Sequence, residues 1–321
     1  MRDILCASRM TLATIEEANN EMSTAKPAVP CRGYWMFVIV GYVVVLGAVL
    51  GGFTLAGGHL GALLQPVELI IIAGSAGGAF FIGNTPAGIK ATFKAIPSAL
   101  KASRFNKALY MDLLALMYEI LSKVRKEGLM SIEGDVENPE SSPIFGKYPS
   151  VTADHHAVEF LTDYLRMMVG GNLNAFEIEN LMDSEIETHH QQSHVPVMSI
   201  GRVADGLPAF GIVAAVMGVV HTMESVGIPP SELGKLIAAA LVGTFLGILL
   251  CYGFIGPIGN LLEQKADEEA KMYLCMKAVL LASMSGYAPQ VAVEFGRKVL
   301  YSHDRPTFIE LEDDLKARKG K

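Results

Sequence analysis

The stretch YWMFVIVGYVVVLGAVLGGFTLAGG, residues 34–58, decides the fold class. It lies within a longer segment, Gly33 to Val67, that contains no Lys, Arg, Asp or Glu. A helix needs about 20 residues to cross the roughly 30 Å apolar core of a bilayer. An uncharged apolar stretch of this length is unusual for a buried helix of a water-soluble protein. It therefore predicts a membrane-spanning helix over about 36–56.

Three more blocks without charged residues follow along the chain, and each is long enough to cross a bilayer. The second span is predicted after the first external loop, and the last two lie close together in the second half. The predicted spans are about 67–85, 203–223 and 235–259. Because proline disrupts helix geometry, we expect Pro208 and Pro257 to kink or end the helices of the last two spans.

The composition agrees with a membrane protein and excludes several other classes. Hydrophobic residues make up 51% and charged residues 18%, whereas a soluble chain carries about 25% charge. The net charge of −7 excludes a general nucleic-acid-coating protein, so no nucleic-acid partner is expected. The four cysteines form no CxxC pair, so neither a disulfide framework nor a zinc ribbon is predicted.

The distribution of basic residues predicts the orientation. The loop between the first two spans has no Lys or Arg, whereas five basic residues follow the second span before any acidic one. Cytoplasmic loops carry an excess of Lys and Arg, so both termini of this multi-pass membrane protein should be cytoplasmic. The expected parts are a polar, disordered tail (1–35), spans one and two (36–89), a cytoplasmic helical domain (90–202), spans three and four (203–259) and a cytoplasmic helix and tail (260–321). Met1, Met22 and Met36 remain alternative starts.

The cytoplasmic part shows helical rather than strand periodicity. Apolar residues recur at helical spacing from Leu109 to Val124 until Gly128 interrupts the pattern. Two further helices are predicted over about 150–169 and 174–193, and the fourth span should continue as a helix into the cytoplasm. The fold class predicted is therefore all-α, with four transmembrane helices and a helical cytoplasmic domain.

Motifs of enzyme chemistry are absent from the sequence. It contains no Walker loop, GxSxG, HExxH or dinucleotide-binding glycine motif, so neither an enzyme nor a cofactor is predicted. His190 and His194 have the i, i+4 spacing of two metal ligands on one helical face. Because no third ligand is evident nearby, a solvated helix end is favoured over a metal site.

Small residues recur at four-residue spacing in every span, which lets helix backbones approach closely. The pairs are Gly47/Gly51, Gly74/Gly78, Gly211/Ala215 and Gly243/Gly247. No charged residue is expected deep in a span, and Glu68 falls at the outer edge of the second. A proton path generally needs a carboxylate within the membrane. We therefore expect this chain by itself to be a poor ion carrier. Thr244 is the best-placed polar side chain, either bonded back to its own helix or lining a path completed by another protein.

Long strings of this sequence resemble the stator proteins of the flagellar motor within the MotA/TolQ/ExbB family. The similar strings include VVLGAVLGGFTLAGGHLGALLQPVELIIIAG, ALYMDLLALMYEILSKVRKEG, DGLPAFGIVAAVMGVVHTM, LVGTFLGILLCYGFIGPIGN and GYAPQVAVEFGRKVLYSHDRPTFIELE. The resemblance covers about residues 36–315. The tail before it departs from the family, whose members normally start close to the first span.

The resemblance implies a stator subunit of the bacterial inner membrane that conducts protons together with a partner. Five copies are expected to surround two MotB chains, which supply a membrane aspartate and an anchor to the peptidoglycan, and to turn the rotor through its protein FliG. By motif, Arg125 and Glu133 match the rotor contact, Pro208 and Pro257 the prolines of conformational coupling, and Thr244 the threonine facing the partner's aspartate.

Three alternatives stay open at this point. A TolQ/ExbB-like energiser of envelope transport uses the same physics but usually has three spans. An independent secondary transporter is disfavoured by the missing membrane charge. The overall similarity favours the proton over sodium as the coupling ion, but sodium stays open because the carboxylate that decides ion selectivity lies in another chain.

Overall fold

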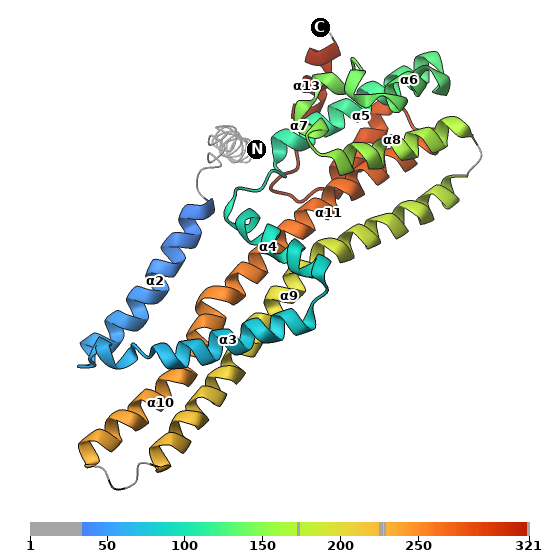
Figure 1. Cartoon of the computed structure of the whole chain (residues 1–321). Coiled ribbons are helices and arrows are strands. Elements are labelled where there is room, and N and C mark those ends of the chain that lie inside the picture. The colour runs from blue at the N-terminus through green and yellow to red at the C-terminus, as the bar shows by residue number, and fades with distance from the viewer. Residues whose placement is uncertain (1–33, 172–173, 225–226, 228, 320–321) are drawn as a thin grey trace, which may run out of the picture.

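The computed structural model describes residues 34–171, 174–224, 227 and 229–319. Every regular element in this part of the chain is helical, which confirms the all-α class (Figure 1). The predicted disordered tail lies outside the described residues, apart from Tyr34 and Trp35, which already belong to the first described helix.

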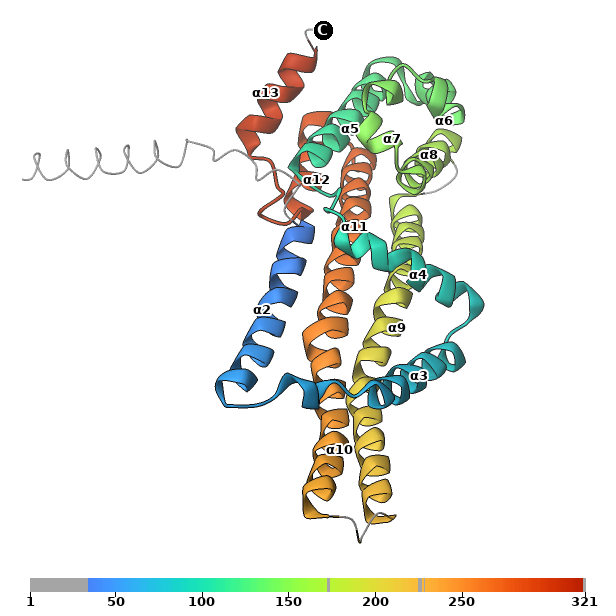
Figure 2. The ribbon, with the colours of Figure 1, turned by 60° about the vertical axis from the view of Figure 1, so that its left-hand side comes forward.

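Four helices are long and apolar enough to cross a membrane. They are α2 (Tyr34–Leu55), α3 (Pro66–Gly83), the second half of α9 (Ala175–Glu224) and α10 (Pro230–Leu250), and a 3₁₀ turn, η2 (Leu60–Leu63), precedes α3. Helices α9 and α10 form a hairpin that projects beyond the other two, while α2 stands apart to one side (Figures 1 and 2). The predicted number of spans is therefore present.

Helix α9 is continuous over 50 residues. The sequence predicted one helix ending near 193 and a separate span starting near 203, but the expected break is absent. Pro196 and Pro208 both lie inside α9, although each removes a backbone N–H from the helix. One helix therefore connects the cytoplasmic part directly to the third span.

The fourth span also continues toward the cytoplasmic part, through a short π-helical segment. Helix α10 passes into η6 (Cys251–Ile255) and then into α11 (Gly256–Met284). The Gly256 N–H donates to the carbonyl of Cys251, five residues back. A proline ring clashes with the carbonyl four residues before it, and a π segment widens the helix at that point. The structure thus accommodates Pro257 by local widening, not by a break.

Helix α4 (Pro86–Leu100) packs across α9 and α11 midway along the molecule (Figure 2). The remaining helices form a compact head at the end opposite the hairpin, together with the adjoining ends of α9 and α11 (Figure 2). Its other elements are α5 (Lys107–Glu127), η3 (Leu129–Ile132), α6 (Glu133–Glu137), η4 (Pro139–Ser141), η5 (Phe145–Lys147), α7 (Pro149–Thr152), α8 (His155–Gly170), α12 (Pro289–Val299) and α13 (Phe308–Lys319). One apolar core fills the head, with Tyr110, Phe145, Phe160 and Leu165 at most 2% exposed.

Polar side chains and one glycine stabilise the ends of helices α4 and α5. The Asn106 side chain accepts a hydrogen bond from the Leu109 N–H at 3.0 Å, which caps the start of α5. Gly128 ends α5 with φ +89°, a value that favours glycine. Lys265 on α11 donates to the Ser98 carbonyl at the end of α4, where a cation also interacts favourably with the helix dipole.

Candidate functional site in the membrane hairpin

Helices α9 and α10 pack backbone to backbone along a line of glycines. A Cβ atom on Gly247 would lie 2.6 Å from the Leu207 carbonyl oxygen and 3.2 Å from Pro208 Cα. One on Gly211 would lie 2.8 Å from the Gly243 carbonyl oxygen. These neighbours are backbone atoms, which cannot move aside as a side-chain end can. We call this contact of α9 and α10, from Leu207 to Gly218 and from Ala240 to Gly247, the glycine seam.

The small-residue pairs predicted in the other two spans behave differently. A Cβ atom on Gly47, Gly51, Gly74 or Gly78 would meet nothing within 4 Å. Of the four predicted small-residue pairs, those on α9 and α10 therefore mediate close helix approach within the single chain, and those on α2 and α3 do not. The glycine faces of α2 and α3 stay open in the single chain.

The structure brings Pro208 and Thr244 together at the glycine seam. Pro208 packs on Gly247, and Thr244 Cα would lie 3.4 Å from a Cβ atom on Gly211. Pro257 lies ten residues beyond Gly247, or about 15 Å along a helix, and its side chain is exposed. Of the three residues predicted for ion passage and coupling, Pro208 and Thr244 therefore lie together at the glycine seam. Pro257 lies apart from them, next to the π-helical segment.

The Thr244 hydroxyl is half-buried and makes no hydrogen bond with any described residue. Other hydroxyls in the apolar helices bond back to their own helix: Thr222 donates to the Gly218 carbonyl at 2.8 Å, and Thr54 to that of Gly51 at 2.8 Å. Of the two roles considered for Thr244, the back-bonded one is not adopted. The hydroxyl is free to face another group.

A carboxylate lies beside the glycine seam, and the sequence analysis missed its burial. Glu68, near the start of α3, is 8% exposed. A Cβ atom on Gly243 would lie 2.9 Å from Glu68 Oε2, and one on Gly218 3.6 Å from Oε1. Two glycines thus leave the space that this side chain fills. Nothing in the sequence near Glu68 signals it, because the glycines belong to two other helices.

The surroundings of Glu68 are almost free of charge. Its Oε2 atom is buried and has no hydrogen-bond partner. Helix α10 has no ionisable residue from Leu236 to Leu250, and within one turn of Gly218 on α9 the only one is His221. An isolated ionised carboxylate would cost several kcal/mol in such a place. Gly243 is 13 residues, or about 20 Å, from the start of α10, so Glu68, which was expected at the outer edge of the second span, packs against the inner part of α10.

Arg125 and Glu133 lie far from the seam, at the outer surface of the head. Arg125 is in the last turn of α5 and Glu133 begins α6; both are exposed, and neither forms an ion pair with a described residue. Their neighbours Lys123 and Asp135 are paired at 2.8 Å and hold α5 against α6. The two predicted rotor-contact residues therefore lie on helices that an ion pair holds together, but neither has an ion-pair partner of its own among the described residues.

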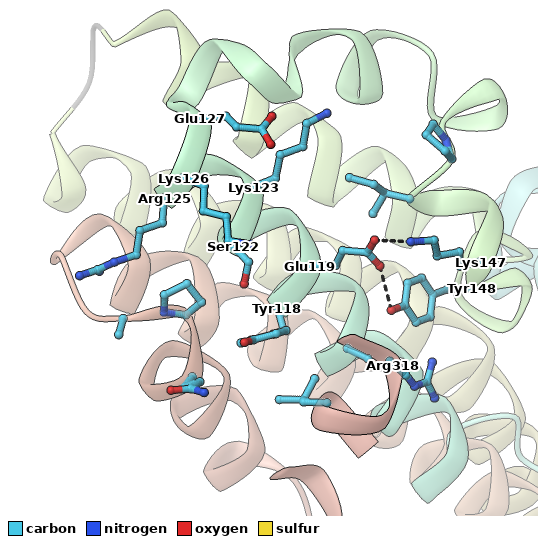
Figure 3. A pocket seen from close by; sticks show the side chains of 17 residues that line it. Tyr118, Glu119, Ser122, Lys123, Arg125, Lys126, Glu127, Lys147, Tyr148 and Arg318 are labelled. Carbon is cyan, nitrogen blue, oxygen red and sulfur yellow. Dashed lines mark hydrogen bonds and ion pairs between the residues drawn. The ribbon is translucent and has the colours of Figure 1, made fainter. Parts of the chain in front are cut away.

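A groove of about 690 Å³ adjoins Arg125 and is lined by α5, α12 and α13, among other segments (Figure 3). At its other end, Glu119 accepts hydrogen bonds from Lys147 and from Tyr148, the latter at 3.2 Å. Burial and the Glu119 carboxylate raise the pKa of Tyr148 to about 12. The charges at that end satisfy each other, whereas Arg125 points away from them (Figure 3).

Two family models match the chain: the N-terminal domain of motility protein A over residues 39–128, and the MotA/TolQ/ExbB proton channel family over residues 153–274. Motility protein A of Salmonella typhimurium is 55% identical over 282 residues, covering 88% of this chain and 96% of that protein. This chain belongs to the MotA family. Motility protein A of Escherichia coli K12 is likewise 55% identical and covers 89% of this chain.

Solved structures of the MotA family share the fold. The flagellar MotAB stator complex from Bacillus subtilis matches with a TM-score of 0.64 and 26% identity, over 87% of this chain and 98% of that one. MotAB of Campylobacter jejuni matches with a TM-score of 0.69 at 19% identity, which bears on the fold alone. The predicted function, a stator protein of the bacterial flagellar motor in the inner membrane, is confirmed over the envelope-transport alternative.

Proposed function

We propose that five copies of this MotA-family chain surround two chains of a MotB-like partner, and that protons crossing the assembly drive torque on the rotor. The chain forms the wall of a channel and is not an enzyme. The likeness to a solved MotAB complex supports the partner, and the match to a proton channel family supports the ion. Swimming speed should therefore fall with an uncoupler and be insensitive to sodium.

The exposure of the apolar helices supports an assembly. In α2, the most apolar 18-residue stretch contains no buried residue, and in the spans of α9 and α10 only 28% of such a stretch is buried. Apolar surface of this extent is covered by lipid or by other chains. The open glycine faces of α2 and α3 allow the close helix contacts that hold membrane assemblies together.

The proposed proton path rests on one observation: two unpaired polar groups, the Thr244 hydroxyl and the Glu68 carboxylate, flank Gly243 in the glycine seam. The partner's membrane carboxylate faces Thr244, and Glu68 carries protons toward it from the external side. Protonation removes the partner's charge, and the surrounding helices repack. Each charge that crosses supplies about 2.3 kcal/mol per 100 mV of membrane potential.

The repacking reaches the rotor through two continuous helices. Pro208, packed on Gly247, lies within α9, and Pro257 follows the π segment between α10 and α11. Both helices lead into the head that carries Arg125 and Glu133, which contact charged groups of FliG. Exposed ion pairs contribute only about 0–1 kcal/mol each. Contacts of that strength suit an interface that is made and broken in every step.

The proposed orientation places the head and both termini in the cytoplasm. Helix α4, which follows the second span, carries Lys90 and Lys94, and Lys101 and Arg104 follow it. The first described residues of α2 lie on the side of the molecule where the head is, as does α13 (Figure 2). The turn η2, the end of α9 at Glu224 and the start of α10 at Pro230 then face outward.

A test of the path replaces Thr244 in cells that lack their own stator genes and receive this chain with its partner. T244V keeps the shape of the side chain but removes the hydroxyl, so rotation of tethered cells should stop while chain and partner still co-purify. T244S, the matched control, keeps the hydroxyl and should keep most of the speed. Wild-type speed in T244V would show that the path does not use this hydroxyl.

A further inference from the structure

Three metal-ligating side chains connect α9 and α11 between the glycine seam and the head. His190 and His194 lie one turn apart on α9, and Asp267 lies beside them on α11. One ligand atom of each residue lies within 4.8 Å of the other two. The imidazole centroids are 4.2 Å apart, and His194 Nε2 is 3.6 Å from an Asp267 carboxylate oxygen.

Two atoms of this cluster are left unsatisfied. His190 Nδ1 and His194 Nε2 are both buried and have no hydrogen-bond partner. Most buried polar side-chain atoms in proteins do have a partner, so two such atoms in one cluster need an explanation. The lone pair of a neutral imidazole nitrogen is the commonest metal donor in proteins. A bound cation would satisfy both nitrogens and the carboxylate together.

We propose that His190, His194 and Asp267 bind a divalent transition-metal ion, for which zinc is the best match. Zinc takes histidine nitrogens and carboxylate oxygens at about 2.0–2.2 Å in a tetrahedral arrangement, which leaves a fourth position here for water. Imidazole ligands favour zinc over magnesium and calcium, which prefer oxygen. The three ligand atoms must approach one another by about an ångström or more, which rotation of the side chains supplies.

The sequence showed two of the three ligands of this site. His190 and His194 have ligand spacing, but the third ligand is more than seventy residues away and is brought close only by the packing of α11 on α9. A second pair follows on the same two helices: His189 Nε2 lies 3.8 Å from Glu269 and 3.3 Å from the Tyr273 hydroxyl. Since His189 already has a hydrogen-bond partner, it is not counted among the ligands.

A metal at this place would tie together the two helices that lead to the membrane. Helix α9 continues from His194 to Pro208, and α11 runs back from Asp267 to Pro257. A coordination bond to each helix holds their separation more firmly than the 3.6 Å contact of His194 with Asp267. Zinc would thus stiffen the connection between the channel wall and the head.

The experiment uses the full chain, purified with its partner and without a polyhistidine tag. Equilibrium dialysis against zinc chloride, with the metal counted by mass spectrometry, should give one zinc per chain. H194Q and D267N should each weaken binding at least tenfold, because each removes one of three ligands. H303Q removes an exposed histidine outside the cluster and should leave binding unchanged. Cobalt supports a second readout, since its visible spectrum reports tetrahedral coordination.

Thermal unfolding distinguishes zinc binding by these three side chains from a role in packing alone. Zinc should raise the unfolding midpoint of the wild-type complex and leave those of H194Q and D267N unmoved, since only a state that binds the ligand is stabilised. Without zinc the three midpoints should agree. Zinc affinity equal in wild type and both variants, or loss of binding in H189Q but not in H194Q, would overturn the proposed ligand set.

Discussion

The head and the membrane hairpin of this chain are stabilised in opposite ways. The head has one continuous apolar core, and charged pairs such as Lys123 with Asp135 connect its elements. The hairpin shares only a small buried cluster with α3 and η6, around Ile72, Ala214 and Cys251, and its helices meet through glycines. The difference teaches that the head buries its apolar side chains within the chain, whereas the hairpin leaves most of its apolar surface for lipid or other chains to cover.

The comparison extends to the polar groups. In the head, most buried carboxylates and hydroxyls have partners: Asp135, for example, accepts from the Ser142 hydroxyl at 2.6 Å. At the glycine seam of the hairpin, Thr244 on α10 and Glu68 Oε2 on the adjoining α3 have none among the described residues. Buried polar groups without partners are costly, so their presence marks a place where a proton or another chain is needed.

The largest effect is expected where backbones touch. G247V places a branched side chain 2.6 Å from the Leu207 carbonyl oxygen and should separate α9 from α10, abolishing motility and co-purification with the partner. G201V is the comparison, because a Cβ atom at this position of helix α9 meets nothing within 4 Å. Equal disruption in G201V would mean that the loss in G247V does not come from the seam contact. Normal motility in G247V would mean that the seam is not a tight contact.

The second effect concerns coupling rather than assembly. P208A restores a backbone N–H inside α9 and removes the proline ring beside the contact with Gly247, so torque should be lost while membrane insertion and partner binding remain. Cell-tethering assays and co-purification measure the two properties separately. Normal swimming in this variant would refute a role for Pro208 in transmission.

The third effect tests the carboxylate that the seam encloses. E68Q keeps the size and polarity of the side chain but cannot exchange a proton, so rotation speed should fall several-fold with unchanged levels of chain and partner. Labelling of the wild-type chain with a hydrophobic carbodiimide, which reacts with protonated buried carboxyls, should modify Glu68. Full speed in E68Q would assign Glu68 a purely structural role.

The fourth effect is partial, because it lies on the solvated surface of the head. R125E or E133K alone should lower torque without changing the unfolding midpoint, since neither residue has an ion pair to lose. K123E is the contrasting variant: it breaks the contact with buried Asp135 and should lower the midpoint. Unchanged torque in both single variants would remove Arg125 and Glu133 from the rotor contact.

The smallest effect is a pH dependence within the head. Hydrogen bonds from Lys107 and from Thr307 hold the pKa of Glu310 at about 2, below its usual value of 4.5. A lowered pKa in the folded state stabilises the head above pH 4.5, and this stabilisation is lost as the pH falls toward 2. E310Q should therefore lower the unfolding midpoint slightly at pH 7 and have no effect near pH 2. Because the pair is exposed, the change should be below about 1 kcal/mol.

The sequence by itself determined the fold class and the number of spans. Uninterrupted apolar blocks such as residues 34–58 can be satisfied only in a bilayer or a deep core, and helical periodicity is a local property. Arg125 and Glu133 are exposed, as their charge favours, whereas their contact with the rotor stays a prediction. The continuity of α9 through Pro196 and Pro208 was not predictable, because local rules treat proline as a helix breaker, whereas packing keeps this helix continuous.

Only the tertiary structure decided which groups meet. Glu68 is charged by its sequence but buried by Gly218 and Gly243, two glycines on helices that fold back from far along the chain. Asp267 joins His190 and His194 in the same way. The physical reason is common to both: a residue's type and helical spacing are fixed by its neighbours in the chain, whereas its burial and its partners depend on helices distant in sequence.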